Sequence, residues 1–121
     1  MKKILFTLPI IISSLTACGG IETKDDLAKL SMEEFAIKAC EEMLDANFEQ
    51  LSVMLQEYHF KKLEKEFAKN SKAWNTLSDR MSCEIKDIKP QENKTKFTFD
   101  RGVFNIDVAK ENNSYLVVDI D

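Results

Sequence analysis

Apolar residues recur at helical spacing over roughly the first two thirds of the chain. After Ser31 they follow steps of three and four residues, and Ser31 with Glu34 matches a capping box, which predicts an amphipathic helix beginning near Ser31. Asn47 breaks this pattern and is a typical N-cap residue, so it is expected to end this helix and to begin the next. The second helix is expected to bury Leu51, Met54 and Leu55.

A third helical stretch carries a longer apolar seam. Asn70 and Ser71 are the only gap in it, so we expect a bend or an interruption there. The lysines and glutamates at 61–66 resemble a recognition patch, but on a helix such a run is more often a solvated face, which is what we expect. The seam consists of Phe60, Leu63, Phe67, Trp74, Leu77 and Met81.

From Cys83 onward the period changes from 3.6 to 2, which predicts four half-buried strands. Turn residues at 90–93, 101–102 and 112–113 separate them, and connections this short require antiparallel neighbours. Helices followed by strands predict an α+β fold, with N-terminal helices packed on a curved four-stranded antiparallel sheet. The side chains expected to point inward are Phe97, Phe99, Phe104, Ile106, Val108, Leu116, Val118 and Ile120.

The first 17 residues have the pattern of a removable export signal. Lys2 and Lys3 precede an apolar run at 4–12, which is too short to span a bilayer. The following residues, Leu15, Thr16, Ala17 and Cys18, resemble the lipobox of bacterial lipoproteins. The resemblance implies cleavage before Cys18, acylation of its thiol and anchoring by membrane lipid. A plain secretory peptide cleaved near Ala17 is the alternative.

In the same family an aspartate after the cysteine favours retention at the inner membrane. Gly19 occupies that position here, so the resemblance implies an outer-membrane protein facing the periplasm. We therefore divide the chain into a signal peptide at 1–17, a lipidated cysteine and tether at 18–30, and one domain at 31–121. Without its first 17 residues the chain has 15 basic and 21 acidic residues, formally −6, which argues against a nucleic-acid partner.

Two cysteines remain in the exported part. Cys40 lies on the apolar side of the first helix and Cys83 opens the first strand. Outside the cytoplasm such a pair is expected to form a disulfide, and two separate buried thiols are the alternative. A metal site is less favoured because the chain has no CxxC motif and His59 is its only histidine.

The stretch EEMLDANFEQLSVML, followed by a four-strand meander, resembles the NTF2-like (cystatin-like) superfamily, in particular its small lipoproteins. In those proteins a first helix ends in a short turn before a second helix containing Phe, matched here by Asp45, Ala46, Asn47 and Phe48. The resemblance implies a cone-shaped domain. Some enzymes of this superfamily place a His inside the cone, which makes His59 a weak candidate for a cavity residue. The alternative is a surface or capping histidine.

The sequence carries no pattern that names a catalytic residue, a metal site or a cofactor. Asp107, Asp119 and Asp121 fall on the outer face of the sheet, where we expect solvated carboxylates rather than a calcium site. The best hypothesis is a lipid-anchored envelope protein with a non-enzymatic binding or structural role, in which a protein partner is possible. One alternative is a periplasmic inhibitor or immunity protein for a basic toxin or hydrolase. Another is a carrier or enzyme that uses an apolar cone cavity.

Overall fold

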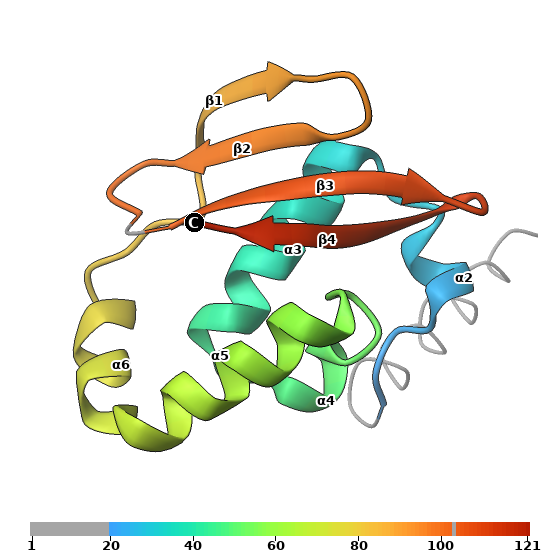
Figure 1. Cartoon of the computed structure of the whole chain (residues 1–121). Helices are drawn as coiled ribbons and strands as arrows, with labels where there is room; N and C mark the ends of the chain where they lie inside the picture. The colour runs from blue at the N-terminus through green and yellow to red at the C-terminus, as the bar shows by residue number, and fades with distance from the viewer. Residues whose placement is uncertain (1–19, 103) are drawn as a thin grey trace, which may run out of the picture.

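Helices cover one face of a four-stranded antiparallel sheet, which confirms the expected α+β class (Figure 1). The computed structural model describes residues 20–102 and 104–121. The helices are α2 (Lys24–Leu27), α3 (Met32–Leu44), α4 (Phe48–Leu51), α5 (Glu57–Lys69) and α6 (Ser71–Ser78). The strands are β1 (Ile85–Pro90), β2 (Thr95–Phe99), β3 (Asn105–Glu111) and β4 (Ser114–Ile120).

The helix boundaries follow from local side-chain chemistry. At the start of α3 the Ser31 hydroxyl accepts from the Glu34 backbone N–H (3.1 Å), and the Glu34 carboxylate accepts from the Ser31 N–H (2.8 Å). This is the capping box that the sequence predicted. The expected break also holds, because Asn70 leaves helical geometry between α5 and α6 (φ −130°, ψ 41°).

The second helix is shorter than the sequence pattern predicted. Asn47 caps it as expected, but α4 ends at Leu51. Beyond it the chain runs beside β4, where the Val117 N–H donates to the Met54 carbonyl (2.8 Å) and the Gln56 N–H donates to the Val117 carbonyl (2.9 Å). Between α4 and this contact the chain forms a turn, in which the Met54 and Leu55 N–H groups both donate to the Leu51 carbonyl (3.0 Å each), so these two buried residues lie outside the helix.

The sheet is a meander with the order β1-β2-β3-β4. Two asparagines with positive φ close the last hairpin, Asn112 at 50° and Asn113 at 65°. Asparagine tolerates this left-handed region better than most residues, which is why the pair predicts a tight turn. The β1–β2 hairpin closes through the Gln91 N–H, which donates to the Lys94 carbonyl (2.7 Å).

A bulge in β4 changes which of its side chains point inward. Asp119 pairs with Asp107, whereas the next pair is Val117 with Val108, so Val118 has no partner in the register. Simple alternation placed Leu116 and Val118 in the core, and for both residues that expectation is wrong. The extra residue reverses the alternation, so Val117 is fully buried. Tyr115 likewise turns inward, with its ring 5.3 Å from that of Phe35.

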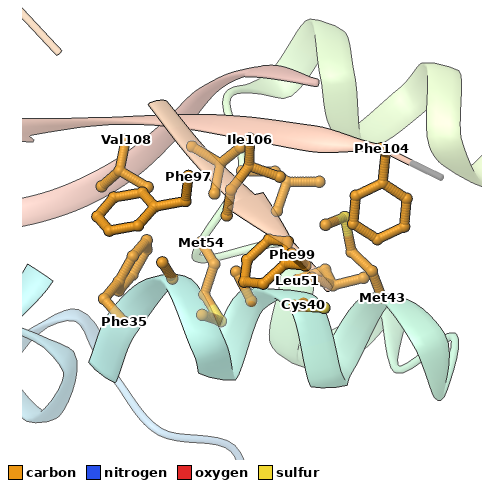
Figure 2. Packing of buried hydrophobic residues seen from close by; sticks show 14 of the residues in the cluster. Phe35, Cys40, Met43, Leu51, Met54, Phe97, Phe99, Phe104, Ile106 and Val108 are labelled. Carbon is orange, nitrogen blue, oxygen red and sulfur yellow. The ribbon is translucent and has the colours of Figure 1, made fainter. Parts of the chain in front are cut away.

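The core lies between α3 and the inner face of the sheet. Phe97, Phe99, Phe104, Ile106 and Val108 point from β2, β3 and the chain before β3 toward the helices, as predicted (Figure 2). Opposing them are the α3 residues Phe35, Cys40 and Met43, together with Leu51 and Met54.

A disulfide joins Cys40 on α3 to Cys83, which lies just before β1. Their Cα atoms are 5.7 Å apart and the two residues are 43 positions apart in the sequence. The expected pairing is therefore confirmed. It ties the central helix to the edge of the sheet that receives the fewest helix contacts, where β1 is mostly exposed.

The segment before α3 differs from the tether that the sequence suggested. Thr23 and Asp26 form a capping box for α2, and Leu27 is fully buried in the core. The Gln50 side chain holds the backbone of Glu22 through both of its polar atoms, at 2.7 and 3.0 Å. Residues 22–30 therefore pack onto the domain instead of linking to it. The signal peptide and lipobox expected at 1–18 lie outside the described residues.

Candidate functional site

An open apolar groove of about 530 Å³ lies where α5 and α6 leave the end of the sheet. Leu63 and Trp74 come from the two helices, Phe104 precedes β3 and Ile120 closes β4. Leu77 on α6 borders the same groove and is 39% exposed, one of the few large apolar side chains on the surface. The remaining lining residues are Glu66, Asn70, Ala73 and Asp121.

Tertiary contacts fix the Trp74 ring at this groove. Its indole N–H donates to the Met43 carbonyl in the last turn of α3 (2.9 Å), and its ring meets that of Phe67 edge to face at 6.1 Å. Phe67 in turn packs against Phe48 of α4. A buried indole N–H normally has an acceptor, so the apolar face of Trp74 can line the groove without an unpaired polar atom.

The groove is acidic at its rim. Glu66 and Asp121 are its only ionisable lining residues, and Glu66 has no ion-pair partner among residues 20–102 and 104–121. A hydrogen bond from Lys96 (2.6 Å), reinforced by its charge, lowers the pKa of Asp121, so this carboxylate is ionised at neutral pH. An apolar floor with acidic edges suits a ligand that presents apolar side chains beside cationic ones.

His59, the weak cavity candidate, lies beside this groove and not in the interior of the domain. Its Nε2 is 3.8 Å from Oδ1 of Asp119, and its side chain is mostly buried. It lines a smaller pocket of about 150 Å³ that shares Leu63, Glu66 and Ile120 with the groove. The structure thus gives His59 a carboxylate neighbour on β4, a contact that no local sequence pattern indicated.

The outer face of the sheet carries an ion-pair network in place of the solvated carboxylates that we expected. Asp107 is only 2% exposed, and its Oδ2 is 2.7 Å from Lys94 Nζ. Its Oδ1 lies 3.4 Å from Lys96 Nζ, which also binds Asp121. The hydrogen bond and charge of Asp107 raise the pKa of Lys94. The ammonium groups of the two lysines therefore balance the charge of a carboxylate that is almost fully buried.

Sequence reasoning located part of this site. It placed Trp74, Leu77, Phe104 and Ile120 on apolar faces, and Phe104 lies in the core as expected, but it did not indicate that the four residues also line an open groove. Their meeting at one open groove depends on the angle at which α5 and α6 leave the sheet, which periodicity does not specify. The prediction for Cys18 falls outside the described residues.

No group of three or more His, Cys, Asp or Glu side chains in 20–102 and 104–121 is arranged to hold a metal ion. Within the same ranges, no helix combines the length and the apolar character needed to cross a bilayer. Comparison of the chain with protein-family models, with curated proteins and with solved structures finds no match in any of the three.

Proposed function

We propose that this chain is a lipid-anchored protein of a bacterial cell envelope whose domain binds a protein partner and performs no catalysis. The anchor is supported by Lys2 and Lys3, the apolar run at 4–12 and the residues Leu15, Thr16, Ala17 and Cys18. The disulfide between Cys40 and Cys83 supports an oxidising compartment, because cytoplasmic thiols are kept reduced. Outer-membrane placement, facing the periplasm, follows from Gly19 under the same resemblance.

The binding role rests on one observation, the open apolar groove with Trp74 in its wall and acidic residues at its rim. The partner that fits it is a cationic protein segment with apolar anchor residues. Apolar anchors would enter beside Leu77 and Phe104, while a Lys or Arg side chain would face Glu66, since Asp121 is already paired with Lys96. The formal charge of −6 on the exported part favours encounter with such a partner.

An NTF2-like arrangement remains our proposal for the finer fold. It is supported by the order of helices before a four-strand meander and by the turn at Ala46, which has a positive φ of 53°. The phenylalanines that fill the space beneath the sheet favour a packed interior over a carrier cavity. The binding site of this proposal is accordingly the groove beside the sheet and not the inside of a cone.

The anchor is tested by replacing the acylated residue. Cys18→Ala is expected to abolish incorporation of labelled palmitate and to leave the signal peptide uncleaved, because the thiol is the site of acylation. The measurement is metabolic labelling followed by mass determination of the purified chain. Equal label in the variant and the natural chain would refute the lipid anchor.

The groove is tested with Trp74, the only tryptophan, as an intrinsic reporter. Two amphipathic peptides of equal length, one of Leu and Lys and one of Leu and Glu, are titrated while Trp74 emission is followed. We expect saturable binding of the Lys peptide, at least about tenfold tighter than that of the Glu peptide. Leu77→Glu should weaken binding, whereas Ile88→Glu, which changes a residue of equal exposure on β1 (38%), should not. Equal binding of both peptides, or equal effects of both variants, would overturn the groove assignment.

The acidic groove also favours the second candidate, a periplasmic inhibitor or immunity protein for a basic toxin or hydrolase. The two candidates differ in the consequence of binding. An inhibitor abolishes the activity of its purified partner at equimolar amounts, and Leu77→Glu should restore that activity. A partner that stays fully active in the complex would exclude this candidate.

A further inference from the structure

Four lysines and a tyrosine share the outermost face of α5. Helical spacing places them on one face of the helix, and together with Glu66 they line a shallow surface hollow of about 420 Å³. Tyr58 is 67% exposed, and Lys61 is paired only with Glu57 on its own helix (3.1 Å). The other members of this lysine face are Lys62, Lys65 and Lys69.

The acidic residues of α5 lie to the sides of this face. Helical spacing places Glu57 and Glu64 on one flank and Glu66 on the other, while the opposite side of the helix buries Leu63 against the core. Lys62, Lys65 and Lys69 have no ion-pair partner among residues 20–102 and 104–121. The charged residues that line the hollow are four lysines and one glutamate, Glu66, so its lining carries net positive charge in a chain whose net charge is negative.

The beginning of the described chain is fastened to the same helical layer. The backbone of Glu22 is held by the Gln50 side chain of α4, and its carboxylate lies 2.9 Å from Lys38 Nζ. Next to Gln50 on α4, Phe48 packs against Phe60 and Phe67 of α5, with ring centroids 6.1 and 5.4 Å apart. The described chain therefore begins at the helical layer and not at the outer face of the sheet (Figure 1).

The length of that chain limits where the domain can lie. Only Gly19, Gly20 and Ile21 separate Cys18 from Glu22, and a fully extended chain spans about 3.5 Å per residue. An acylated Cys18 therefore stays within about 14 Å of Glu22. A domain held so closely has one side in the headgroup region, where anionic lipids attract Lys residues and where Tyr is a favoured residue.

We propose that the lysine face of α5 docks on an anionic lipid surface, so that the helical layer faces the membrane and the outer face of the sheet points away from it. This inference rests on the lipid anchor of the proposed function. It goes beyond the anchor because it assigns an orientation, a lipid charge and the residues that make the contact.

The test is amine labelling of the acylated chain on vesicles. The chain is placed on phosphatidylcholine vesicles with or without phosphatidylglycerol, and acetylation of each lysine is followed by mass spectrometry. On the anionic vesicles Lys62, Lys65 and Lys69 should react several-fold more slowly than on the zwitterionic ones. Lys86 and Lys89 of β1, exposed on the sheet, should react equally on both. High salt should remove the difference, since exposed charges are screened.

Matched triple variants separate a specific contact from net charge. Lys62→Glu, Lys65→Glu and Lys69→Glu together should abolish the protection of Lys61, whereas Lys86→Glu, Lys89→Glu and Lys110→Glu together should leave it unchanged. All six lysines are exposed, so neither set removes buried contacts. Equal effects of the two sets would overturn the proposal, as would equal labelling on the two kinds of vesicle.

Two controls separate the membrane contact from a free-anion site and from the anchor itself. Inorganic phosphate added to chain on zwitterionic vesicles should not protect the lysines, and protection by phosphate alone would replace the membrane contact with a free-anion site. Flotation tests the anchor separately. A chain that fails to float with phosphatidylcholine vesicles contradicts the lipid anchor, whereas one that floats with fully reactive lysines contradicts only the orientation.

Discussion

Buried polar side chains do much of the positioning in this small domain. Gln50 is 3% exposed and satisfies both backbone polar groups of Glu22, so it fixes the start of the fold. Asp107 is buried on the outer face of the sheet, where it pairs with Lys96 of β2 and with Lys94 in the turn before β2. Each such group costs free energy when it is buried without a partner, so its partners are part of the fold.

The ion pairs of Asp107 with Lys94 and Lys96 should contribute to the stability of the domain. Asp107→Asn keeps the shape and removes the charge, so we expect a loss of about 1–3 kcal/mol in the free energy of unfolding. The control Asp119→Asn changes a more exposed carboxylate on β4, and it should cost less than about 1 kcal/mol. Urea denaturation of both variants measures the difference. Equal losses of unfolding free energy in the two variants would show that the buried ion pairs of Asp107 contribute no more to stability than an exposed carboxylate does.

Elements are held together by contacts between residues that are distant in the sequence. The bulge at Val118 turns Val117 into the core, and the backbone of Met54 and Gln56 bonds to Val117 along the edge of β4. At the opposite edge β1 has few helix contacts of its own, and the disulfide is what links its start to α3. Both edges of the sheet therefore depend on contacts that lie outside the strands.

Removal of the disulfide should lower the stability of the domain. The double change Cys40→Ala and Cys83→Ala should lower the free energy of unfolding by about 2–4 kcal/mol, because it frees a long loop in the unfolded chain. The loss is measured as a lower denaturant midpoint. Reduction of the natural chain should lower the midpoint by a similar amount, since it opens the same loop. Unchanged midpoints in both experiments would contradict a structural role for the bridge.

At the scale of the whole molecule, large apolar residues occupy two places. Some fill the interior and stabilise the fold, and others line the groove, where they can contact a ligand. Phe97 and Phe99 lie under the sheet, where they meet α3 and are almost fully buried. Trp74 and Leu77 lie where the helical layer separates from the sheet, so part of their apolar surface stays accessible. A chain of this size can form one core, and the surplus apolar surface is what the groove exposes.

A packed interior predicts a large cost for truncation of Phe99. Phe99→Ala should reduce the free energy of unfolding by about 3–5 kcal/mol, because a filled core cannot collapse around the missing ring. Leu116→Ala, at a side chain that the bulge turns away from the core, should cost less than about 1 kcal/mol. Denaturant unfolding measures both, with titration of an apolar dye alongside. A Phe99→Ala variant as stable as the natural chain, with stoichiometric dye binding to the latter, would favour the carrier alternative.

Local physics alone determined the helix caps at Ser31 and Asn47, the break at Asn70, the turn at Asn112 and the alternation of β2 and β3. In each case neighbours within a few residues supply the deciding hydrogen bond or dihedral preference. The pairing of Cys40 with Cys83 was also accessible, because few cysteines leave few choices. Tertiary structure alone decided the bulge in β4, the early end of α4 and the docking of residues 22–30. It also decided where Trp74, His59 and Asp107 find their partners. Those outcomes depend on which surfaces meet in the folded chain. The extra residue in β4 and the hydrogen bonds between Gln50 and Glu22 do not change the pattern of apolar and polar residues, so the sequence pattern does not predict them.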